Sequence, residues 1–198
     1  EADTEGGPVE IGVGGARGPG KSHGVFAQVV VDDCQRVPGI KGLFLRQTGK
    51  AAKESFEDLI DRVLRGKLSH TYNSSNGVVK FPNGSRLLLG GFENENDIDK
   101  YVGIQYDLMA VEELNQLTEE KVIKLKGSLR TSKQGWRPRL YTSFNPGGIG
   151  HGFIKNSYVT PFRENNEGKT RFIPANYKSN PYLNKEYIEY LEALTGNL

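Results

Sequence analysis

The stretch that decides the fold runs from Gly14 to Gly24 and reads GGARGPGKSHG. Within it, residues 15–22 match the pattern G-x-x-x-x-G-K-[ST] without a mismatch. An apolar run (8–15) precedes it and predicts a buried strand, and residues 21–33 follow with apolar side chains at helical spacing. A glycine-rich loop between a strand and a helix aims successive backbone N–H groups at phosphate oxygens. We therefore predict a phosphate-binding loop, the alternative being a turn that is merely rich in glycine.

This loop implies a bound nucleotide and a metal ion. Lys21 is expected to bridge the β- and γ-phosphates of ATP, and so to be catalytic, and the Ser22 hydroxyl is expected to ligate Mg²⁺. The start of the following helix adds partial positive charge. The expected nucleotide-binding residues are those of the loop and the first helical turn: Gly15, Ala16, Arg17, Gly18, Pro19, Gly20, Lys21, Ser22 and His23.

The segment YDLMAVEE (106–113) is an apolar run that ends in two acids. In hydrolases with such a phosphate loop, a neighbouring strand ends in an acid that holds the metal through water. Glu112 is placed for this role, although the usual residue is Asp. Glu113 is placed to orient the attacking water as general base. The alternative is that both are ordinary acids at a helix N-terminus, where the dipole favours them.

Composition and charge limit the class of protein. The 198 residues are enough for one domain with a buried core, and we expect a single domain over 1–198. The formal net charge of +2 indicates no global attraction to nucleic acid, although a local basic face remains open. The single cysteine, Cys34, excludes an internal disulfide and fits a reducing cytosol. No apolar run approaches membrane-spanning length, so no membrane partner is expected.

The rest of the chain alternates predicted strands and helices. Strands are expected at 41–49, 104–113, 137–148 and 170–176, and helices at 51–66, 93–103, 118–129 and 184–194. Asn-Gly between two apolar runs predicts an antiparallel hairpin at 77–91. The polar stretch 163–169 is expected to be a loop. This order predicts an α/β fold of the P-loop NTPase type, with a mostly parallel sheet flanked by helices.

Taken in order, these pieces resemble the ATPase domain of the phage large terminase subunit, the motor that drives viral DNA into a procapsid. The phosphate loop carries an arginine in GARGPGKS, and YVGIQYDLMAVEE (101–113) ends in the two acids. YTSFNPGGIGHGFIKNSY (141–158) resembles the segment that couples hydrolysis to movement, and SNPYLNKEYIEYLEALTG (179–196) resembles the end of that domain. The resemblance covers most of the chain and implies the ASCE type of P-loop fold.

The resemblance gives roles to three further residues. Arg17 is expected to approach the γ-phosphate from its own subunit and to offset transition-state charge, the alternative being a surface ion pair. Asn145 is expected to sense the γ-phosphate or the water and to pass that state to the next loop, although Asn-Pro-Gly also forms turns. The family's arginine from a neighbouring subunit falls near Lys100, which is not arginine, so Arg130 is our substitute candidate among several exposed arginines.

The resemblance also implies partners and a location. Double-stranded DNA, the portal protein and the small terminase subunit are expected partners of a homo-oligomeric ring on the procapsid, in the host cytoplasm. The family's C-terminal nuclease domain is not expected in this chain, which begins with Glu1 and reads as an excised piece.

Other functions share the nucleotide motifs. A helicase or another nucleic-acid-stimulated ATPase is the main alternative, although a second motor domain is missing from the sequence. A small-molecule kinase would not need a water-activating glutamate. A non-enzymatic alternative is a nucleotide-binding assembly module whose turnover is weakened by Glu112.

Overall fold

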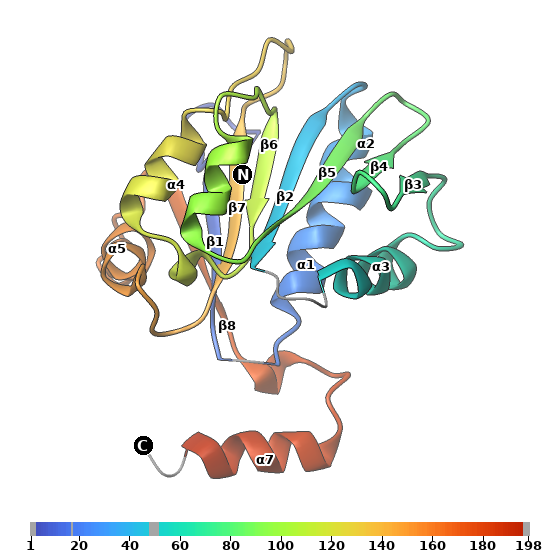
Figure 1. The fold of residues 1–198 in the computed structure, drawn as a ribbon. Helices are drawn as coiled ribbons and strands as arrows, with labels where there is room; N and C mark the ends of the chain where they lie inside the picture. The colour runs from blue at the N-terminus through green and yellow to red at the C-terminus, as the bar shows by residue number, and fades with distance from the viewer. Residues whose placement is uncertain (1–2, 17, 48–51, 196–198) are drawn as a thin grey trace.

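The computed structural model describes residues 3–16, 18–47 and 52–195, and in these ranges the chain forms an α/β fold around one sheet (Figure 1). The strands are β1 (Glu10–Gly15), β2 (Lys41–Gln47), β3 (Thr71–Asn73), β4 (Val78–Lys80), β5 (Arg86–Phe92), β6 (Leu108–Val111), β7 (Arg139–Phe144) and β8 (Thr170–Ala175). Their order across the sheet is β3-β4-β5-β2-β6-β7-β1-β8. All neighbours from β5 to β8 pair in parallel. The predicted mostly parallel sheet is confirmed.

Helices cover both faces of this sheet, with α1, α2 and α3 on one face and α4 and α5 on the other (Figure 1). The α-helices are α1 (Lys21–Ala27), α2 (Cys34–Arg36), α3 (Ala52–Val63), α4 (Glu119–Lys126), α5 (His151–Ile154), α6 (Thr160–Arg163) and α7 (Lys185–Thr195). The π-helical segments are η1 (Gln28–Asp33) and η4 (Lys155–Val159), and the 3₁₀ segments are η2 (Glu95–Tyr101), η3 (Leu114–Gln116) and η5 (Tyr177–Ser179). No helix in the described ranges is both long and apolar enough to cross a membrane.

The core consists of two apolar clusters, one on each face of the sheet. Alternation along β2 divides its side chains between them: Phe44 joins the cluster under α1 and α3, whereas Leu43 and Leu45 join the cluster under α4 and α5. Since both faces of β6 are covered, all four of its residues are buried. The sheet is therefore a rigid frame that holds the loops at its strand ends.

Element types follow the prediction closely, and the element bounds differ. The hairpin is present, because β4 and β5 pair antiparallel across the turn at Asn83 and Gly84. Strand β3 was not predicted, since its three residues are mostly exposed and carry no apolar alternation. The short helix predicted at 93–103 is present as the 3₁₀ helix η2 (Glu95–Tyr101), and the polar stretch 163–169 contains turns after α6.

The carboxyl ends of the parallel strands meet at one edge of the sheet, which points downward in Figure 1. In open α/β sheets, ligands bind at this edge. Strand β7 lies between β1, which leads into the glycine-rich loop, and β6, which leads into the acid pair. The sheet order therefore brings the two predicted motifs to neighbouring positions, with Asn145 after the strand between them.

Candidate functional site

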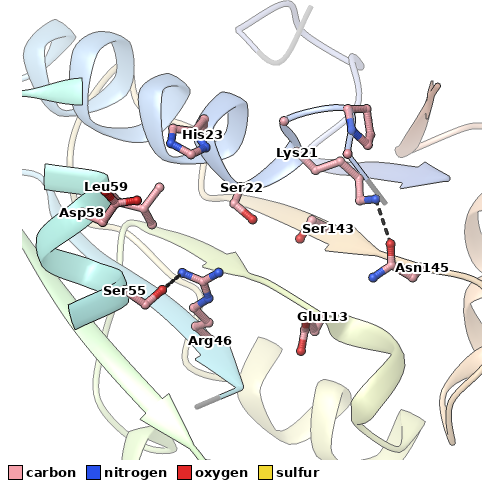
Figure 2. Close-up of a pocket in the computed structure, with 13 residues that line it drawn as sticks. Lys21, Ser22, His23, Arg46, Ser55, Asp58, Leu59, Glu113, Ser143 and Asn145 are labelled. Carbon is pink, nitrogen blue, oxygen red and sulfur yellow. Dashed lines mark hydrogen bonds between the residues drawn. The ribbon is translucent and has the colours of Figure 1, made fainter. Parts of the chain in front are cut away.

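A pocket of about 330 Å³ opens at this edge (Figure 2). The glycine-rich loop and α1 form one wall, with Lys21, Ser22 and His23. Glu113 and Asn145 line the same pocket from the segments that follow β6 and β7. The pocket therefore gathers residues from both predicted motifs, which lie about half the chain apart in sequence.

The loop turns into α1 at Gly20, whose φ of 81° lies in the left-handed region. A residue with a Cβ is strained there, so glycine is needed at this turn. Helix α1 then begins at Lys21 as predicted. Gly15, Ala16, Gly18 and Pro19 complete the described part of the loop, whereas Arg17 lies outside the described residues.

Lys21 folds back over the loop. Its Nζ donates hydrogen bonds to the carbonyl oxygens of Gly15 (3.1 Å) and Ala16 (2.6 Å) and to Oδ1 of Asn145 (2.8 Å; Figure 2). The ammonium group is thus held within the loop by three acceptors. An incoming phosphate would have to replace at least one of them.

Glu112 carries a deeply buried carboxylate. Its side chain is 1% exposed, and neither carboxylate oxygen has a hydrogen-bond partner of good geometry among the described residues. Burial raises the pKa of Glu112, and the nearby Ser22 hydroxyl and Arg46 guanidinium oppose this rise. A carboxylate in this state is incompletely compensated and favours a cation.

This carboxylate fits the expected Mg²⁺. The described residues contain no cluster of three His, Cys, Asp or Glu side chains that would form an all-protein metal cage. Mg²⁺ is instead commonly held by one or two carboxylates together with substrate phosphates. Ser22 and Glu112 would provide that partial site, with the nucleotide completing it.

Arg46 is a site residue that the sequence reasoning missed. It follows the apolar run of β2, and its Nε lies 3.3 Å from Oε2 of Glu112. Its guanidinium also donates to Oγ of Ser55 on α3 (Figure 2). The sequence pattern that could have identified Arg46 is a charged residue at the carboxyl end of a buried strand. The same pattern led to the prediction for Glu112.

Glu113 differs from Glu112 in its backbone conformation and in its exposure. Its φ of 53° is left-handed, which is uncommon for a residue with a side chain. Such outliers cost about 1–3 kcal/mol and concentrate at functional sites. The side chain is partly exposed, lines the pocket, and does not cap the short helix η3 that follows. Two adjacent carboxylates therefore occupy different environments, one buried and one facing the pocket.

Asn115 connects the acid pair to the loop after β7. This residue is 3% exposed, and its Oδ1 accepts a 3.2 Å hydrogen bond from the backbone N–H of Asn145. Its carbonyl oxygen accepts another, at 3.0 Å, from the backbone N–H of Gly150. The predicted coupling residue is thus tied to Lys21 by its side chain and to Asn115 by its backbone.

His23 directly follows the loop in sequence, whereas the C-terminal segment touches the loop from a distant part of the chain. His23 lines the pocket, and its pKa is lowered by burial and by the nearby Arg62 guanidinium, which favours the neutral imidazole. Asn180 donates a 2.7 Å hydrogen bond from Nδ2 to the carbonyl oxygen of Gly18. A side chain at Gly18 would meet Leu183 and Leu191 within 3.4 Å. The C-terminal segment therefore packs directly on the loop, a contact the sequence did not reveal.

A model of one protein family, described as phage terminase large subunit, matches residues 9–197. The chain belongs to the phage terminase large subunit family. A search among curated proteins gives no significant match.

Solved terminases share the fold. The large terminase of a thermophilic bacteriophage gives a TM-score of 0.74 at 18% identity, over 93% of this chain and 45% of that one. The same phage protein in complex with ATP-γ-S gives a TM-score of 0.71 at 16% identity, over 93% of this chain and 44% of that one. The large terminase of bacteriophage HK97 gives a TM-score of 0.62 at 11% identity, over 96% of this chain and 44% of that one. The chain thus spans less than half of these solved proteins, and within that part it has their ASCE-type P-loop fold.

Arg130 lies away from this terminase pocket. Its backbone N–H donates to the carbonyl oxygen of Tyr106 at 2.9 Å, which places it before the amino end of β6. The pocket lies beyond the carboxyl end of the same strand. Arg130 is exposed and is not among the residues that line the pocket of its own chain.

Proposed function

We propose that this terminase chain is an ATP-hydrolysing motor domain that couples Mg-ATP hydrolysis to the movement of double-stranded DNA into a procapsid. The observation that carries the proposal is the convergence of Lys21, Glu113 and Asn145 on one pocket. A phosphate-binding lysine, a pocket-facing carboxylate and an amide are the groups that ATP hydrolysis requires. The thermophilic phage terminase, whose fold this chain shares, binds ATP-γ-S in its solved complex.

Phosphate binding would be shared by the N–H groups of the loop, Lys21, Mg²⁺ and Arg17. Lys21 would exchange its contact with Asn145 for the β- and γ-phosphates, and the N–H groups of the loop would face their oxygens. Ser22 and Glu112 would hold Mg²⁺, which when bound neutralises charge on the phosphate oxygens. Arg17, from the resemblance, would add a guanidinium at the γ-phosphate.

Hydrolysis needs a base for the attacking water. Glu113 would accept a proton from a water molecule in line with the γ-phosphate, because its carboxylate faces the pocket while that of Glu112 is buried beneath it. Arg46 would hold Glu112 ionised at the same time. The two acids therefore have separate roles, proton acceptance by Glu113 and metal binding by Glu112.

Activity would depend on assembly. We expect a homo-oligomeric ring on the portal protein of a procapsid, with the small terminase subunit as a further partner in the host cytoplasm. In such a ring Arg130 of one subunit would approach the pocket of the next, which fits its position far from its own pocket. An arginine supplied from outside can raise the rate by about 10³–10⁵-fold.

ATP turnover measured with and without double-stranded DNA tests the proposal. We expect slow turnover that double-stranded DNA stimulates, and we expect Lys21→Ala to abolish it while the protein stays folded. Stimulation by single strands alone would favour a helicase-like ATPase. Binding of ATP without turnover under any condition would favour an assembly module, and unchanged turnover in Lys21→Ala would remove the proposal.

A further inference from the structure

Three cations lie side by side across neighbouring strands at the sheet edge opposite the nucleotide pocket. Arg86, the first residue of β5, pairs in register with Lys80 of β4 and with Lys41 of β2. Directly paired residues point to the same face of a sheet. Lys80, Arg86 and Lys41, which we call the basic row, therefore span about 10 Å on one face, since strands are about 4.8 Å apart.

The basic row is unfavourable for folding. Like charges directly opposite each other in a sheet are destabilising. Elsewhere on this chain cations are commonly paired, as Lys124 is with Glu120 and Arg62 with Asp58. Within the described ranges none of the three row cations forms an ion pair, and Lys41 instead lies 5.3 Å from the centre of the Tyr106 ring. This uncompensated charge indicates an anionic partner.

The surface around the basic row is hollowed. A cavity of about 390 Å³ has the three cations, Asn76, Ile104 and Tyr106 in its wall. Lys80, Arg86 and Asn76 are exposed. The nearby carboxylate of Asp107 is 5% exposed, and its two oxygens accept from the Lys41 backbone N–H and the Thr131 hydroxyl. Both oxygens of Asp107 are therefore held by neutral donors, and among the described residues it forms no ion pair with the basic row.

We propose that the basic row binds the phosphate backbone of double-stranded DNA. A duplex carries one negative charge per about 1.7 Å of its axis, so a row of about 10 Å meets several phosphates. The choice of DNA among polyanions rests on the proposed packaging function. Because the row lies at the amino edge of the sheet and the pocket at the carboxyl edge, DNA and nucleotide bind without competing for the same cations.

The test is DNA binding as a function of salt. Anisotropy of a fluorescein-labelled duplex is measured between about 50 and 200 mM salt, where each neutralised phosphate contributes about 0.9 to the slope of log K against log salt. We expect Lys80→Gln/Arg86→Gln to weaken binding by about 10- to 100-fold at the lowest salt and to reduce the slope by nearly 2. The matched control is Lys124→Gln/Lys185→Gln, which removes the same charge from exposed, acid-paired positions.

The outcomes distinguish failure of the basic row as a DNA site from failure of the proposed packaging function. Equal weakening by the two double variants would mean that only net charge matters and would overturn the basic row as a site. Parent-like binding and slope in Lys80→Gln/Arg86→Gln would overturn it as well, while leaving the packaging function intact. A parent chain that does not bind duplex DNA even at low salt would overturn both. The midpoint of thermal unfolding of Lys80→Gln/Arg86→Gln should be at or above that of the parent chain, because the substitutions remove repulsion between like charges.

Discussion

Nζ of Lys21 and Oδ1 of Asn145 are 2.8 Å apart, so the lysine predicted to bind phosphate is held by the residue predicted to couple hydrolysis to movement. The same Asn145 is anchored by its backbone to Asn115, which lies two residues after the predicted general base. A phosphate that draws Lys21 away would free the Asn145 amide while its backbone stays anchored. The two residues therefore provide a direct path from nucleotide occupancy to the loop after β7.

Asn145→Ala should lower kcat without weakening ATP binding. The substitution removes an acceptor that competes with phosphate for Lys21, and it removes the amide that would face the γ-phosphate. Titration with a fluorescent ATP analogue and steady-state turnover measure the two effects separately. Asn145→Asp is the contrasting variant, because its carboxylate should hold Lys21 more tightly and repel phosphate, which raises the Kd. A similar Kd increase in both variants would contradict this competition.

Glu113→Gln should bind ATP and Mg²⁺ but hydrolyse about 10²–10⁴-fold more slowly, because the amide keeps the shape and loses the basicity. Glu112→Gln should instead raise the Mg²⁺ concentration needed for half-maximal turnover, since it removes the buried carboxylate. Magnesium titrations of both variants make the comparison. Parent-like turnover in Glu113→Gln together with an inactive Glu112→Gln would show that the roles are exchanged.

Arg46→Gln should move the acidic limb of the pH–rate profile to higher pH. Burial already raises the pKa of Glu112, and the Arg46 guanidinium opposes this rise. Without it, Glu112 stays protonated to a higher pH, so Mg²⁺-dependent activity is lost earlier on acidification. Arg46→Lys keeps the charge and should restore much of the profile. Two superimposable profiles for Arg46→Gln and the parent would exclude Arg46 from this role.

Arg17→Ala should lower kcat more than it raises the apparent KM for ATP, if Arg17 acts mainly on the transition state. Steady-state kinetics on the folded variant separates the two parameters. A change in KM alone would make Arg17 a ground-state phosphate clamp. Unchanged kinetics would favour the alternative that Arg17 forms a surface ion pair.

If a neighbouring subunit supplies part of the catalytic charge, as proposed, the specific ATPase activity should rise with protein concentration. Arg130→Ala should reduce this rise without changing nucleotide affinity, since Arg130 lies far from its own pocket. Arg65→Ala is a suitable control, because Arg65 is exposed and paired with Asp61. Light scattering follows assembly in parallel. Full activity in a dilute monomer would contradict activation between subunits.

Local patterns were enough to predict the loop and the acid pair. Gly20, Lys21 and Ser22 lie in one short motif that is recognised from adjacent residues alone, and Glu112 and Glu113 follow a short apolar run that predicts a buried strand. The antiparallel hairpin was predictable for the same reason, since its turn residues lie between its own strands.

Contacts set by strand register were not predictable. Arg46 reaches Glu112 because Leu45 and Val111 are partners across β2 and β6. The basic row likewise depends on the pairing of three strands. Sequence periodicity reports which face a residue takes, but it does not report which strand lies next to it. The role of Arg17 stays a prediction, because this residue lies outside the described part of the chain.

Leu191 of α7 and Leu183, just before α7, lie beside Gly18, so the last described helix helps to hold the predicted nucleotide site. In Figure 1 α7 lies apart from the sheet, so its removal would be expected to leave the sheet unchanged. A truncation before Asn180 would remove both the leucines and the amide that holds the Gly18 carbonyl, and so would loosen the phosphate loop without altering any residue in it. A shortened chain that lost ATP affinity would therefore mislead anyone who read that loss as misfolding of the sheet.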